Sequence, residues 1–130
     1  MTLEDKALLL KDLCARLPYG VKMIDTEPYS AEYNPILTLS YISEDNCIGC
    51  RAGKGVMATS LGSIKPYLFP LSSMTEEQSK VYHELINGMF GTSALINFEV
   101  LTDFFNSNHF DYRGLIKMGL AVDATGLNIY

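Results

Sequence analysis

ILTLSYIS, residues 36–43, decides the fold class, because its apolar and hydroxyl side chains alternate with the period of a β-strand. Leu37, Leu39 and Tyr41 are expected on one face of this strand, with the intervening hydroxyl side chains on the other. Turn residues and further short apolar runs fill the rest of residues 21–68. We therefore predict four or five strands in this part, forming a small, bent antiparallel sheet or a partial barrel.

Helical periodicity flanks this region on both sides. Before it, apolar residues recur every three or four positions between Thr2, a plausible N-cap, and Pro18, which ends the pattern. After Pro70, two overlapping capping boxes precede a second amphipathic helix. The boxes pair Ser73 with Glu76 and Thr75 with Gln78. The order of elements predicts an α+β fold with an N-terminal helix, the sheet or partial barrel, and a C-terminal helical part.

The C-terminal part continues with a third predicted helix, between Ser93 and Asn108. Its apolar side chains lie almost all round the helix, so we expect it to be the central one. A short helix over residues 113–118 and a final strand in LAVDA, residues 120–124, complete the predicted elements.

Composition limits the possible functions. With 130 residues and 48% hydrophobic content, the chain fits a single domain, residues 1–130. Its formal charge of −5 argues against a long DNA or RNA partner, because phosphate backbones are held by a surplus of Lys and Arg. No apolar run reaches the roughly 18 residues of a membrane span. We expect no membrane and a cytoplasmic location, since three cysteines without an export signal indicate reduced thiols.

Three short motifs resemble known chemistry incompletely. CIGC, Cys47 to Cys50, has the spacing of a redox pair or half a zinc site, but a turn follows where a redox pair needs a helix. GCRAGKG, residues 49–55, departs from a phosphate-binding loop in spacing and lacks its hydroxyl, so we interpret it as a hairpin turn. No nucleophile elbow supports a Ser-His-Asp triad. We therefore assign no catalytic residue, no metal ligand and no cofactor.

NSNHFDYRG, residues 106–114, concentrates polar and aromatic side chains at the end of the third predicted helix. Most of them suit a structural corner: Asp111 can cap the next turn and His109 can bond a carbonyl. Arg113 lies beside the aromatic Tyr112 and near a predicted helix start. Proteins also use this combination of groups to bind a phosphate or a base. A scaffold and a ligand site both remain open for this corner.

Three blocks of the sequence resemble a known group of proteins. They are LLLKDLCARLPYGVK, IKPYLFPLSSMTEEQ and FFNSNHFDYRGLIKMGLA. Together they resemble small uncharacterised proteins of bacteriophages and mobile elements of Bacteroides-type gut bacteria. The chain departs from the pattern at Phe69, where arginine is usual, and at Phe104 and Phe105, where a Trp-Leu pair is common. The resemblance implies a setting in which short accessory proteins act on the host, some as oligomeric sponges for nucleotide immune signals.

The first hypothesis for function is a phage or mobile-element accessory protein that sequesters a small anionic nucleotide signal without catalysis. A homo-oligomer is expected, and six residues are expected to bind the ligand. Arg113 and Lys65 would hold phosphate, Tyr67 and Tyr112 would stack on a base, and His109 and Asp111 would orient the pocket.

Two alternatives remain. One is a protein–protein interaction module that inhibits or recruits a host or phage protein, with Leu8, Tyr29 and Tyr33 as contacts. The other is a nucleotide-cleaving enzyme with His109 as general acid or base.

Overall fold

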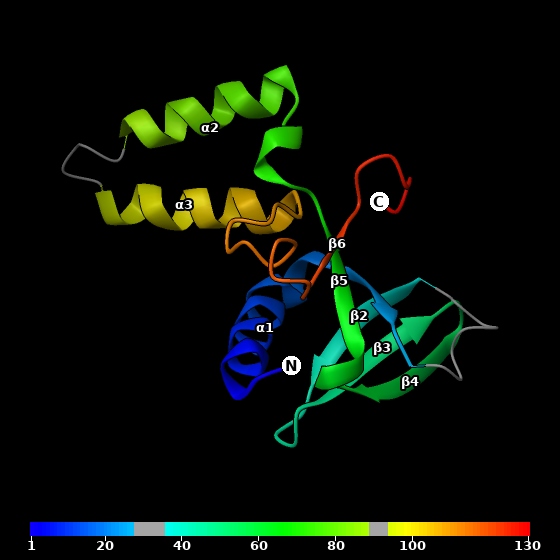
Figure 1. Ribbon diagram of the computed structural model, residues 1–130. Coiled ribbons are helices and arrows are strands. Elements are labelled where there is room, and N and C mark those ends of the chain that lie inside the picture. The colour runs from blue at the N-terminus through cyan, green and yellow to red at the C-terminus, as the bar shows by residue number, and fades with distance from the viewer. Residues whose placement is uncertain (28–35, 89–93) are drawn as a thin grey trace.

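The computed structural model describes residues 1–27, 36–88 and 94–130, and for residues 94–97 only the backbone (Figure 1). Tyr29 and Tyr33, expected as contacts of an interaction module, lie outside the described residues. Along the described residues, no helix combines the length and the apolar composition needed to cross a bilayer.

A six-stranded sheet forms one part of the molecule, with its strands in the order β4-β3-β2-β1-β5-β6 (Figure 1). Neighbouring strands from β4 to β5 pair antiparallel, and β6 joins β5 in parallel. The sheet does not close, so β4 and β6 are its edges. The predicted α+β class is confirmed, and the sheet is open and mixed rather than a partial barrel. The strands are β1 (Lys22–Asp25), β2 (Leu37–Ile42), β3 (Cys47–Ala52), β4 (Gly55–Ser60), β5 (Ile64–Leu68) and β6 (Val122–Asp123).

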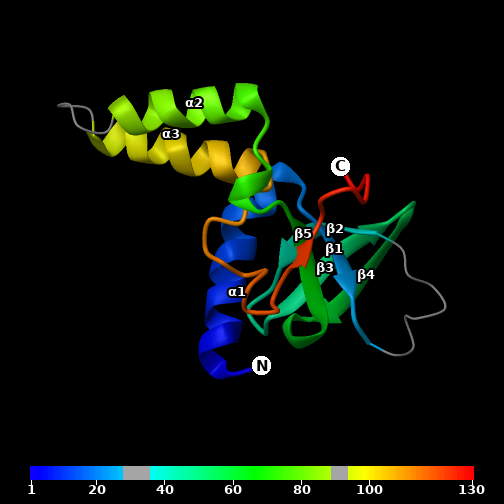
Figure 2. The ribbon, with the colours of Figure 1, turned by 45° about the horizontal axis from the view of Figure 1, so that its top comes forward.

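Helix α1 (Leu3–Arg16) lies against one face of the sheet (Figures 1 and 2). Thr2 caps this helix, as the sequence predicts. It does so through a reciprocal capping box with Asp5, which was not predicted from the sequence. Leu9 and Leu13 are fully buried against the sheet, which removes their side chains from water and contributes roughly 1.5–3 kcal/mol each. Leu8 is partly buried and packs against the same core. The sheet residues of this core are Met23, Leu37, Leu39, Ile48, Cys50, Ile64 and Leu68.

A bulge in β2 changes the face to which Tyr41 belongs. Leu39 pairs with Cys50, but Tyr41 pairs with Gly49, because the register shifts between them. The ring of Tyr41 lies over Gly49, where an added Cβ would come within 2.0 Å of it. Tyr41 is therefore 44% exposed. The prediction that it shares the buried face of Leu37 and Leu39 is wrong, because the inserted residue reverses the alternation.

Helices α2 (Glu76–Gly88) and α3 (Ala94–Ser107) form a hairpin that projects from the rest of the molecule (Figures 1 and 2). Of the two predicted capping boxes, that of Thr75 and Gln78 forms, with both backbone–side-chain hydrogen bonds present. The prediction that the third helix is central is wrong. Phe98 and Val100 of α3 are 58% and 43% exposed, because α3 packs mainly on α2 and meets the body at its C-terminal end (Figure 1).

After α3 the chain makes turns rather than the predicted short helix over residues 113–118. Gly114 and Gly119 have φ of 78° and 76°, and these left-handed residues interrupt a right-handed helix at both ends of the segment. The predicted final strand forms only as the two residues of β6. This segment leads from the hairpin back to the sheet (Figure 1).

Candidate functional site

The corner that follows α3 is built on a buried carboxylate from α1. Asp12 and Arg16 are one helical turn apart and both side chains are fully buried. The Nε of Arg16 donates to Asp12 Oδ2 at 2.7 Å, and the Nη1 of Arg113 donates to Asp12 Oδ1 at 3.0 Å. Arg16 Nη2 donates to the carbonyl of Phe110 at 2.6 Å. Asp12 therefore joins two guanidinium groups that approach it from α1 and from the corner.

Tyr112 lies between these cations and the hairpin. Its ring stacks on Phe105 with centroids 5.1 Å apart, and its hydroxyl donates to Asn106 Oδ1 at 3.1 Å. The guanidinium carbons of Arg113 and Arg16 lie 4.5 and 5.4 Å from the ring centroid. Arg113 also donates to the Tyr112 hydroxyl. Both the face and the hydroxyl of Tyr112 are thus engaged within the chain.

Asp111 caps the turn that follows it, as the scaffold interpretation predicts. Its Oδ1 accepts from the amide of Leu115 at 2.8 Å and its Oδ2 from the amide of Ile116 at 2.9 Å. The backbone of the same residue is tied to the sheet, because its amide donates to the carbonyl of Phe69 at 2.8 Å. Asp111 thus holds the corner in place through both its side-chain carboxylate and its backbone amide.

His109 lies on the other side of the corner, against the end of the chain. Its backbone is left-handed, with φ of 60°, and its ring stacks on Tyr130 with centroids 3.7 Å apart. The Tyr130 hydroxyl donates to the carbonyl of Tyr67 at 2.7 Å and accepts from the amide of Lys22 at 3.0 Å, so it bridges β5 and β1. Burial is the main cause that raises the pKa of Tyr130 to about 12. These contacts of Tyr130 join segments far apart in the sequence, and no local sequence pattern indicates them.

Lys65 and Tyr67 lie two residues apart on β5, on the same face of the strand. Lys65 is opposite Ile24 of β1 and is half-buried, whereas Tyr67 is buried. The structure thus divides the six predicted ligand residues. Arg113 and Tyr112 join the polar cluster beside α1, and Asp111 caps the turn that follows it. His109 meets Tyr67 through Tyr130, and Lys65 remains on β5 opposite Ile24.

Asp12 and Arg16 are the residues that sequence reasoning missed at this site. Their spacing of four is the usual spacing of an ion pair on a helix surface, and the sequence offers no reason to expect burial. A signal was present in part, because an Asp and an Arg at this spacing can neutralise each other inside a protein.

The cysteine pair is divided by the strand that carries it. Cys47 and Cys50 are three positions apart on β3, so they lie on opposite faces, with Cys50 buried in the core. Burial raises the pKa of the Cys50 thiol, which keeps it protonated and unreactive at neutral pH. Within residues 1–27, 36–88 and 94–130, no three His, Cys, Asp or Glu side chains gather as metal ligands would.

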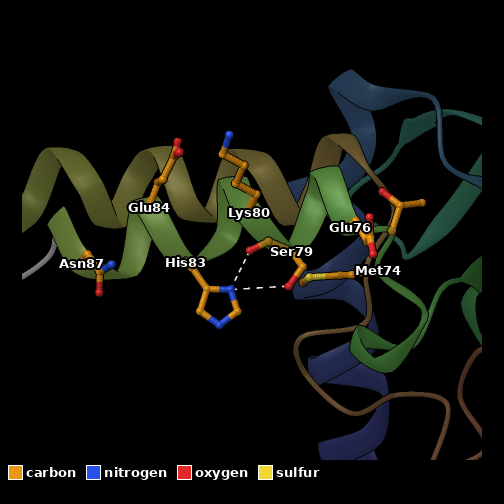
Figure 3. Close-up of a pocket in the computed structure, with 8 residues that line it drawn as sticks. Met74, Glu76, Ser79, Lys80, His83, Glu84 and Asn87 are labelled. Carbon is orange, nitrogen blue, oxygen red and sulfur yellow. Dashed lines mark hydrogen bonds between the residues drawn. The ribbon is translucent and has the colours of Figure 1, made fainter.

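Two hollows in the described part of the chain lie apart from the predicted ligand residues. One of about 200 Å³ beside the corner is lined by Phe69, Ser73, Thr75, Gln78, Asn108 and Phe110, which include none of the six. A shallower one of about 550 Å³ follows the polar face of α2, where His83 points away from α3 and its Nδ1 lies 2.6 Å from the Ser79 carbonyl (Figure 3). Neither hollow supplies a convergent set of charged groups.

Comparisons with protein-family models, with curated proteins and with solved structures find no match to this chain. The function therefore has to be argued from the geometry.

A pH prediction follows from His109. Burial, followed by the charges of Arg16 and Lys22, lowers its pKa from 6.5 to about 4. Because the folded-state pKa is the lower one, protonation favours the unfolded chain. The stabilisation is complete above about pH 6.5 and is lost as the pH falls to about 4.

We expect His109→Asn to weaken this acid dependence, because asparagine tolerates the left-handed backbone and does not titrate. Urea unfolding at neutral pH and at pH 4.5 should show a smaller loss of stability in the variant than in the parent. His83→Asn is the control, since His83 is exposed. Equal losses in parent and His109→Asn would show that His109 does not contribute to the acid sensitivity.

Proposed function

We propose that the protein is a non-catalytic interaction module and that the α2–α3 hairpin is the part that binds a protein partner. The observation that carries the proposal is that α2 has no buried residue and packs on α3 rather than on the sheet. Val81, Phe98 and Val100 add apolar surface that is 42%, 58% and 43% exposed. Exposed apolar surface of this kind on a projecting element is typical of protein-binding sites.

Charge suggests what the partner is like. Residues 76–107 contain five carboxylates and a single lysine, so they hold −4 of the chain's formal −5. A partner that buries the apolar side chains would therefore bring an apolar strip flanked by Lys or Arg. The carboxylates are Glu76, Glu77, Glu84, Glu99 and Asp103.

The contacts expected for such a module from the sequence differ from these. Leu8 packs against the core rather than projecting, and Tyr29 and Tyr33 lie outside the described residues. The hairpin replaces them as the proposed contact surface. The resemblance to phage and mobile-element proteins of Bacteroides-type bacteria favours a bacterial or phage protein as the partner.

The test is quantitative affinity capture from an extract of such a bacterium, with and without phage infection. Phe98→Glu is expected to reduce capture of the hairpin partner at least about 30-fold, because a central apolar contact contributes about 2 kcal/mol or more. Met118→Glu is the matched control, since Met118 is 49% exposed but lies outside the hairpin. Equal loss of capture in both variants, or in neither, would contradict the proposal.

Capture of a small anionic nucleotide at the corner is the second candidate. The observation that favours it is that Arg16 Nη1 is buried without a hydrogen-bond partner in the described part of the chain. A phosphate would have to compete with Asp12 for both arginines. Native mass spectrometry with cyclic dinucleotides, cyclic trinucleotides and ADP-ribose derivatives tests this candidate: an intact ligand bound by the parent and lost in Arg113→Ala would support it.

A further inference from the structure

We propose that the β4 edge of the sheet binds β4 of a second copy of this chain, antiparallel and about a two-fold axis. The contact would join two sheets into one continuous sheet and would leave both hairpins free. This contact does not depend on what the hairpin binds. It would be the subunit interface of the homo-oligomer that we expect.

The backbone of β4 determines which groups are free. β3 and β4 are joined by a two-residue turn, with Ala52 opposite Gly55. In such a hairpin the closing pair is hydrogen-bonded and the pairing then alternates, so Val56, Ala58 and Ser60 direct their N–H and C=O groups away from β3. The Ser60 carbonyl already accepts from Ser63 Oγ at 3.1 Å. Within residues 1–27, 36–88 and 94–130, this edge therefore offers both backbone groups of Val56 and Ala58 and the N–H of Ser60.

The side chains of β4 do not protect this edge. Natural sheets block edge strands with charged residues, proline or bulges. β4 contains none of these: its sequence is GVMATS and its pairing with β3 is regular over six positions. Val56 is 66% exposed and Met57 is 38% exposed. Burial of these two side chains would add an apolar contribution to the backbone hydrogen bonds.

Symmetry then favours a second copy as the occupant. An antiparallel pair with Ala58 on the two-fold axis places Ala58 opposite its own copy and Val56 opposite Ser60 of the partner subunit. The Ala58 residues exchange two hydrogen bonds, and each Ser60 N–H can donate to a Val56 carbonyl across the axis. No charged side chains oppose each other within the paired strands, because β4 has none. A two-fold contact of this kind closes at the dimer.

The experiment is the solution mass of the full chain over a concentration series, by light scattering after size exclusion and by native mass spectrometry. We expect a dimer for the parent. Ala58→Pro removes an outward N–H that β3 does not use, and Ala58→Lys places two ammonium groups opposite each other at the axis. Both should give monomers, and high salt should partly restore the Ala58→Lys dimer.

Ala58→Thr is the matched control, because threonine keeps the N–H and suits a strand. It should remain a dimer. Circular dichroism of each variant separates loss of pairing from loss of folding. A parent that stays monomeric at every concentration, or a dimer that folded Ala58→Lys leaves intact, would overturn the β4 pairing. Neither result would affect the hairpin proposal, whose test is the capture lost in Phe98→Glu.

Discussion

Asp12→Asn is expected to lower the free energy of unfolding by about 3–5 kcal/mol, because it leaves two guanidinium groups together without their carboxylate. Arg16 is fully buried beside it and the side chain of Arg113 is 17% exposed, so water can solvate only one of the two cations. Asparagine has nearly the same volume, which separates the loss of charge from the loss of packing. Urea unfolding followed by circular dichroism measures the change.

Glu4→Gln is the control for this prediction, because Glu4 is exposed on the same helix and its neutralisation should change stability by only a few tenths of a kcal/mol. If Asp12→Asn is no more destabilising than Glu4→Gln, the buried cluster does not hold the corner to α1. If instead Asp12→Asn is folded and binds an anionic nucleotide more tightly than the parent, the two arginines form a ligand site that Asp12 occupies in the free protein.

Phe110→Ala is expected to have an effect of similar size, about 3–5 kcal/mol, because it empties a fully buried aromatic position. Phe110 is 1% exposed, and its ring lies 5.9 Å from that of Phe104, centroid to centroid, in the cluster at the base of the hairpin. Its carbonyl accepts a hydrogen bond from Arg16, and its backbone forms an isolated β-bridge with Phe69. The substitution should therefore weaken the attachment of the hairpin to the body.

Phe98→Ala is the matched control, since it removes the same ring from an exposed position on α3. The loss of stability in that variant should be about 0.5 kcal/mol. The pair of variants also separates the two uses of phenylalanine in this region. Phe110 should matter for stability, and Phe98 should matter for binding. A loss of several kcal/mol in Phe98→Ala would show that the exposed ring is part of the folded core.

The class of the fold could be predicted because its signals are local. Alternation in residues 36–43 indicates a strand whatever it pairs with, and Thr2, Thr75 and Asp111 cap their turns through amides within a few residues. Such interactions are fixed by the chain's own neighbourhood. The order of helix, sheet and helical part follows from them.

The short helix expected over residues 113–118 failed for a local reason, the left-handed Gly114 and Gly119, whereas three other errors concern contacts between residues that are apart in the sequence. Tyr41 changes face because a bulge in β2 fits its ring over Gly49 of β3. The apolar surface of α3 indicates burial, but the described part of the chain covers only some of it, and we assign the remainder to a partner. From the sequence, Asp12 is expected on the surface of its helix. In the fold it is buried and accepts a hydrogen bond from Arg113, which lies far along the chain. Periodicity carries no information about such pairings.

The sequence indicated which residues belong to the candidate corner, but not which contacts they make. The sequence identified the corner of residues 106–114, and the structure engages the side chains of Tyr112, Arg113 and Asp111 with their neighbours and with α1. In the described part of the chain, His109 Nδ1 is buried without a hydrogen-bond partner. Lys65 and Tyr67 lie on a strand that meets the corner through Tyr130. A list of reactive residue types cannot distinguish a ligand site from a hydrogen-bonded scaffold. The difference lies in whether their donors and acceptors are already satisfied.

The most direct test of the account is hydrogen–deuterium exchange of the full chain, alone and in complex with the protein captured by the parent. The account predicts slower exchange of the backbone amides of α2 and α3 in the complex, with residues 106–116 unchanged. Protection confined to residues 106–116, with the hairpin exchanging as in the free protein, would contradict it and would make the corner the functional site.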